Sequence, residues 1–175
     1  RVFILVIIAL TIATLYSHPK TRGKERVYLG QIMLAFGYGP LAFSIGLFTN
    51  KVNIDIHLII IWSILFVGNM MIGISADLLD FEDNRTLNIK NIVTKHGKRN
   101  LINFIILSNI ILIILLTIVY WLNIFAISHI ALIALILILL IRIWGLAKVE
   151  KKLKLTTIHL LSIAGECLLP FLFIK

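Results

Sequence analysis

The segment IHLIIIWSILFVGNMMIGISA at residues 56–76 runs directly into DLLDFEDNR at residues 77–85. The first segment holds no Lys, Arg, Asp or Glu, and a helix of about 20 such residues crosses the roughly 30 Å of hydrocarbon in a bilayer. The second segment places four carboxylates and one arginine at the end of that helix. This combination predicts a membrane-spanning helix with a polar site at its mouth.

Charged residues make up 14% of the 175-residue chain and hydrophobic residues 60%, whereas soluble domains carry about 25% charged residues. Apolar runs of spanning length recur at residues 2–16, 29–48, 56–76, 101–122, 126–147 and 156–174. We therefore predict an all-α fold, a multi-pass transmembrane helical bundle that forms a single domain over residues 1–175.

The net charge of +9 comes from Lys and Arg residues that gather in alternate connections, at residues 17–28, 77–100 and 148–155. The intervening connections hold Lys51 alone. This alternation follows the positive-inside rule and predicts an integral membrane protein with its three basic connections in the cytoplasm. The cations form no continuous face for nucleic acid, and a single cysteine provides neither a disulfide framework nor a Cys/His zinc site.

The acidic segment is a candidate metal site. If the third helix continues through it, Asp77, Asp80 and Asn84 fall on one face, and Asn69 and Gly73 extend that stripe. Oxygen ligands without His or Cys favour a hard cation, in particular Mg²⁺. The alternative is a solvated loop with incidental charges. The basic residues that follow at 90–99 favour the metal interpretation, because carboxylates, a divalent ion and cations together hold a diphosphate.

Two apolar runs contain unusual residues. FGYGP at residues 36–40 puts two glycines and a proline inside the second run, and we favour a kink that improves packing over a break that faces a ligand. Glu166 in the last run needs a proton, a partner or a cavity; a contact between helices is favoured over a place in a substrate chamber.

Two segments resemble a known family. YSHPKTRGK at residues 16–24 resembles a Y-S-x-P-x-x-R/K-x-K element, and DLLDFEDNRTLNIKNIVTKHG at residues 77–97 resembles the second aspartate-rich segment of the UbiA-type intramembrane prenyltransferases. Their order, with two spans between them, is also similar. The resemblance covers the whole chain as the fourth to ninth spans of a nine-helix bundle. It therefore implies a UbiA-like fold with six of the nine expected helices.

The resemblance implies a Mg²⁺-dependent enzyme that moves a prenyl group from a prenyl diphosphate to an aromatic, quinone-precursor or lipid acceptor in the membrane. On that analogy Asp77 and Asp80 ligate Mg²⁺ and are catalytic together with Lys24. The further residues that it assigns are the metal ligands Asp83 and Asn84, the diphosphate-binding Arg22, Arg85 and Lys90, and the chamber residues Tyr16, Ser17 and Asn69.

The chain departs from the family pattern at three places. Asn84 stands where an aspartate is usual, with the acid shifted back to Asp83, and Asn88 replaces a glycine. The first aspartate motif of the family does not occur in these residues. A catalytically incomplete member or a fragment of the family therefore stays open as an alternative. So does a cation-coupled transporter, whose ion site would lie near the middle of the membrane.

Overall fold

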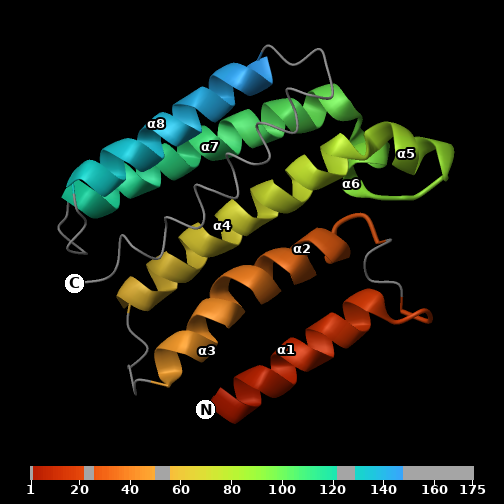
Figure 1. Ribbon diagram of the computed structural model, residues 1–175, viewed down its shortest axis with the longest axis horizontal. Coiled ribbons are helices and arrows are strands. Elements are labelled where there is room, and N and C mark those ends of the chain that lie inside the picture. The colour runs from red at the N-terminus through yellow and green to blue at the C-terminus, as the bar shows by residue number, and fades with distance from the viewer. Residues whose placement is uncertain (1, 22–25, 50–55, 122–128, 148–175) are drawn as a thin grey trace. The chain divides into compact units, whose positions relative to one another are not determined.

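The computed structural model describes residues 2–21, 26–49, 56–121 and 129–147, and in these ranges its regular elements are all helices (Figure 1). The predicted all-α class is confirmed. The chain divides into two compact units, Arg1–His96 and Gly97–Lys175, which we describe separately. The predicted sixth span at 156–174, with Glu166, lies outside the described residues.

The first unit is built from three long helical segments and two short helices. Its elements are α1 (Val2–Ser17), α2 (Leu29–Phe36), η2 (Gly37–Leu41), α3 (Ala42–Phe48), α4 (Ile56–Leu79), α5 (Phe81–Thr86) and α6 (Ile92–His96). The segment formed by α2, η2 and α3 lies between α1 and α4 (Figure 1). Short helices α5 and α6 follow α4, and α6 packs back against it.

The FGYGP segment forms one π-helical turn, η2, and does not interrupt the span at 29–48. Pro40 has no N–H to donate, and the N–H of Ala42 reaches the carbonyl of Gly37 five residues earlier. A Cβ atom at Gly39 would lie 2.9 Å from the carbonyl oxygen of Leu65 on α4. The glycine thus permits close approach of the two helices, as the packing interpretation expected.

The second unit contains α7 (Lys98–Trp121) and α8 (His129–Ala147), which pack side by side (Figure 1). The buried residues of α7 recur at helical spacing and form one stripe: Leu101, Ile105, Ser108, Asn109, Leu112, Leu116 and Val119. On α8 the buried apolar residues are Leu132, Leu135 and Leu139. Each helix therefore uses one face for packing.

The remaining faces of these helices are apolar as well. Ile111, Ile114 and Ile118 on α7 are about half exposed, which suits contact with lipid rather than water. Three described segments, Leu29–Phe48, Leu58–Leu79 and Lys98–Trp121, are long and apolar enough to cross a membrane, and Val2–Ser17 and Leu132–Ile143 are shorter apolar helices.

Candidate active site

The Asp77 carboxylate lies near the end of α4 and is held by an amide from another helix. Gln31, in the first turn of α2, donates a hydrogen bond from Nε2 to Oδ2 of Asp77 at 2.5 Å. The Asn91 side chain, just before α6, is a second hydrogen-bonding neighbour of the carboxylate. Both amides are buried, at 6% exposure each. The aspartate is thus fixed by two separate elements before any ligand is present.

The acidic segment is not a simple continuation of α4. The helix ends at Leu79, and Asp80, with φ −93° and ψ 15°, is the residue that precedes α5. The helix is interrupted at Asp80, but the Asn84 N–H still donates to the Asp80 carbonyl at 2.8 Å, so these two residues lie one helical turn apart. Asp77 is part-buried, whereas Asp80 and Asp83 are exposed. The turn therefore separates a fixed acid from two that face outward.

The loop between α5 and α6 explains one departure from the family pattern. Asn88 has φ +54°, a left-handed backbone conformation that glycine adopts readily and that asparagine tolerates better than other residues. Asn91 and Thr94 then cap α6 reciprocally: the Thr94 N–H donates to Asn91 Oδ1 at 2.9 Å, and the Asn91 N–H donates to Thr94 Oγ1 at 3.0 Å. This cap holds Asn91 beside Asp77.

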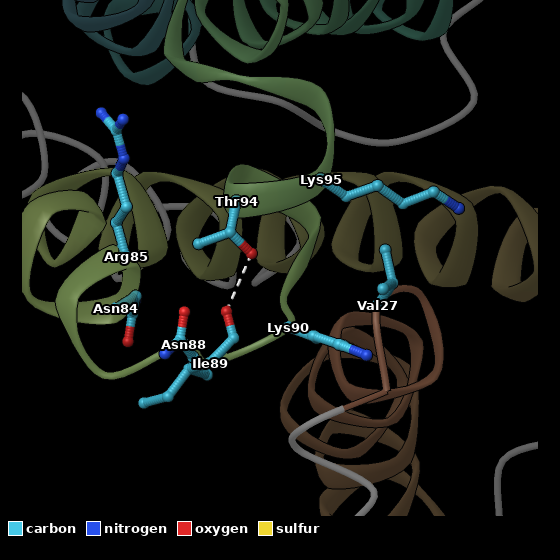
Figure 2. Close-up of a pocket in the computed structure, with 8 residues that line it drawn as sticks. All are labelled: Val27, Asn84, Arg85, Asn88, Ile89, Lys90, Thr94 and Lys95. Atoms are coloured by element: carbon cyan, nitrogen blue, oxygen red, sulfur yellow. Dashed lines mark hydrogen bonds between the residues drawn. The ribbon is translucent and has the colours of Figure 1, made fainter.

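A basic pocket of about 390 Å³ lies beside this loop (Figure 2). Its cations are Arg85, Lys90 and Lys95, and its lining contains no acidic residue. In the view of Figure 2, Lys90 and Lys95 extend toward the side of Val27, and Arg85 extends from the other end. The pocket is completed by Asn84, Asn88, Ile89 and Thr94. Its charge suits an anion such as a phosphate group.

Tyr28 connects this basic loop to the start of α2. Its hydroxyl is 2.7 Å from Nε2 of His96, and the Nζ atom of Lys95 lies 4.8 Å from the centre of the tyrosine ring. The second contact is a cation–π interaction. These contacts bring together the two connections, 17–28 and 77–100, in which the sequence placed its candidate residues.

A second cavity, of about 340 Å³, lies between α1 and the segment of α2 and η2. Tyr16 and Ser17 line it, together with Tyr38 and apolar side chains such as Ile12 and Met33. Such a lining suits an apolar or aromatic group more than a charged one.

Asn69 and the remaining predicted residues lie elsewhere. The Asn69 amide donates to the Leu65 carbonyl within its own helix at 3.0 Å and lies against Gly39, so this contact belongs to helix packing. Arg22 and Lys24 lie outside the described residues. In the ranges that the structure describes, no three His, Cys, Asp or Glu residues are grouped so as to hold a metal ion.

The atom type of the possible ligands around Asp77 nevertheless suits a hard cation. They are the carboxylate oxygen atoms of Asp77 and Asp80. Soft ligands are absent from this group of residues. These oxygen atoms are of the kind that Mg²⁺ prefers.

The sequence profile of the UbiA prenyltransferase family matches residues 1–163. The chain belongs to this family. Among solved structures it is similar to a UbiA homolog from Archaeoglobus fulgidus bound to Cd²⁺, with a TM-score of 0.66 and 20% identity over 99% of this chain and 64% of that chain. The form bound to GPP and Mg²⁺ gives a TM-score of 0.66 and 20% identity over 98% of this chain and 62% of that chain. No curated protein matches the chain.

The UbiA resemblance drawn from the two motifs is therefore confirmed. At 20% identity the solved homolog shows that the helical fold is shared. The chain spans less than two thirds of that homolog's length. The long apolar helices and the family together identify an integral membrane protein.

Sequence reasoning missed two buried polar residues of this UbiA family member. Gln31 is the lone amide of the span at 29–48, and Arg142 is the lone charged residue of the span at 126–147. Arg142 is 2% exposed and donates from Nη1 to Oδ1 of Asn109 at 3.2 Å. In both cases the sequence contained a usable signal. A single polar residue within an apolar run indicates a functional contact or a packing contact between helices.

Proposed function

We propose that the protein is a Mg²⁺-dependent prenyltransferase that moves a prenyl group from a prenyl diphosphate to a hydrophobic or aromatic acceptor within the membrane. The observation that carries the proposal is the Asp77 carboxylate, which two buried amides fix at the end of an apolar spanning helix. A carboxylate in such a place is costly unless it serves a ligand. Family membership makes a prenyl diphosphate with a metal ion the leading candidate.

Each group of residues has a role in this proposal. Asp77 and Asp80, with Asp83 and Asn84 in support, would hold Mg²⁺, which when bound supplies positive charge that favours the departure of diphosphate. Cations at the basic pocket, Arg85 and Lys90, would bind the phosphate oxygens. From the connection that precedes α2, Arg22 and the catalytic Lys24 would approach the same group.

The transfer itself needs few protein groups. The allylic carbon–oxygen bond breaks and its electron pair leaves with the diphosphate; the acceptor nucleophile then bonds to the allylic carbon and releases a proton. Tyr16, Ser17 and Tyr38 line a largely apolar cavity where a developing carbocation would meet little water and aromatic faces would stabilise it. The family resemblance assigns Asn69 to the same chamber, although its amide bonds to the Leu65 carbonyl in this structure.

The position of the acids argues against the transporter alternative. Asp77 is two residues from the end of α4 at Leu79, whereas coupling ions in secondary transporters bind near the bilayer midplane. The excess of Lys and Arg in the connections at 17–28 and 77–100 predicts by the positive-inside rule that this end of the helix faces the cytoplasm, where diphosphate substrates are available.

The test is release of diphosphate from a prenyl diphosphate by the complete gene product in nanodiscs, with and without Mg²⁺. We expect turnover that requires Mg²⁺, and a loss of about 100-fold or more in Asp80→Ala and Asp77→Asn, since each change removes charge that acts on the leaving group. Glu82→Gln, an exposed neighbour on α5, is the matched control and should retain activity. A wild-type protein that never releases diphosphate would support the catalytically incomplete alternative.

A further inference from the structure

Gln31 is a buried polar residue, and helix packing alone does not explain why an amide occupies this position. It is 6% exposed and lies in the first turn of α2, a helix whose other residues are apolar. Its Nε2 donates to Asp77, and its Oε1 is buried with no hydrogen-bond partner in the described part of the chain. A buried acceptor without a partner costs stability. An apolar residue of equal volume would pack here at lower cost, so the amide is explained better by what it does to Asp77.

The orientation of this amide follows from chemistry. Only the NH₂ group of Gln31 can donate to a carboxylate, so Oε1 must point away from Asp77. The space that it occupies is provided by Gly73, where a Cβ atom would lie 2.1 Å from Oε1. Gly73 is one helical turn before Asp77 on α4 and shares its face. The glycine is therefore the cradle that allows the glutamine to reach the aspartate.

Two amides leave Asp77 free to bind a ligand. A carboxylate has about four lone-pair directions; the hydrogen bond from Gln31 uses one of them, and the Asn91 side chain is a second polar neighbour. The donors come from different elements, α2 and the N-terminal cap of α6. They restrict the rotation of the carboxylate and still leave acceptor sites for a cation. Groups that orient a metal ligand in this way typically affect metal affinity by about 10- to 100-fold.

We propose that Gln31 is a positioning residue that holds Asp77 in the orientation for cation binding, and that Gly73 is the residue that makes this contact sterically possible. The inference rests on the proposed function, because it assigns Asp77 a cation. It adds Gln31 and Gly73 to the proposed site, and both residues lie outside the two segments, 16–24 and 77–97, that resemble the family motifs.

The experiment measures the affinity of the complete gene product for Mg²⁺ by calorimetry in the presence of a non-reactive prenyl diphosphate analogue. Gln31→Met keeps the volume and removes the donor, and we expect it to weaken Mg²⁺ binding by about 10- to 100-fold. Ser44→Ala is the matched control, since Ser44 is buried and bonds only within its own helical segment, to the Pro40 carbonyl; it should bind Mg²⁺ like the wild type.

A double-mutant cycle shows whether Gln31 acts through Asp77. In an Asp77→Asn background, the additional change Gln31→Met should alter Mg²⁺ affinity less than twofold, because the group that it orients is no longer a charged ligand. An equal loss in both backgrounds, or unchanged affinity in Gln31→Met alone, would overturn the inference and leave the proposed function standing. A wild-type protein that shows no Mg²⁺-dependent binding of the analogue would overturn both.

Gly73→Ala disrupts the contact between Gln31 and Asp77 by a steric change and so provides a second test of it. The added methyl group would meet the flexible end of the Gln31 side chain, so the amide should swing away from Asp77 while the helices stay in place. We expect the same 10- to 100-fold loss of Mg²⁺ affinity. Gly46→Ala on α3, where a Cβ atom would have nothing within 4 Å, should leave the affinity unchanged. If Gly73→Ala bound Mg²⁺ as tightly as the wild type, the proposed role of Gly73 in making room for Gln31 would be wrong.

Discussion

The two units bury polar side chains in different ways. In the first unit a part-buried hydrogen bond joins the Asp77 carboxylate, near the end of α4, to the neutral amide of Gln31. In the second unit it joins a cation to a neutral amide, Arg142 to Asn109, between the paired helices α7 and α8. The first contact leaves lone pairs of Asp77 for a ligand, whereas the second lies within the packed stripe of α7. The proposed function therefore gives the charge of the first unit a role in binding, whereas the charge of the second unit lies in a contact between two helices.

The largest stability effect should come from breaking the contact in the second unit. Asn109→Leu removes one acceptor of a charged, buried guanidinium, and we expect the free energy of unfolding to fall by about 2–3 kcal/mol. Thermal or denaturant unfolding in detergent micelles measures it. Adding Arg142→Met should cost less than the sum of the two single changes, since both remove one interaction. Unchanged stability in Asn109→Leu would contradict the assigned difference between the units.

The same comparison shows what the sequence could and could not predict. Runs of apolar residues located the described spans to within three residues at each end, because a membrane sets helix length directly. The chemistry of Asp77 and Asp80 was visible in the local motif. Gln31 was not, because its role depends on the register between α2 and α4, which no local pattern encodes. The interruption of the helix at Asp80 was also not predicted. It allows the chain to turn so that α6 packs against α4, and this contact between distant residues leaves no local pattern in the sequence.

A second prediction tests whether the first unit depends on close helix contact rather than on its polar groups. Gly39→Ala puts a methyl group 2.9 Å from the Leu65 carbonyl oxygen, and backbone atoms cannot move aside as a side chain does. The two spans must separate, at a cost of about 2 kcal/mol in the free energy of unfolding. The matched control is Gly46→Ala, which meets no atom within 4 Å. Equal stability of the two variants would show that η2 and α4 are not in tight contact.

The smallest effect concerns the loop of the first unit that presents Asn91. Asn88 adopts φ +54°, so Asn88→Ala should lower the free energy of unfolding by about 1 kcal/mol, because a Cβ without a compensating polar group is disfavoured in the left-handed region. Asn88→Gly should be as stable as the wild type or slightly more so, as the usual glycine of the family at this position suggests. Unfolding curves of the three proteins, measured together, give the order. If alanine proved as stable as glycine, the left-handed turn would not constrain the loop, and the fixed position of Asn91 beside Asp77 would need another cause.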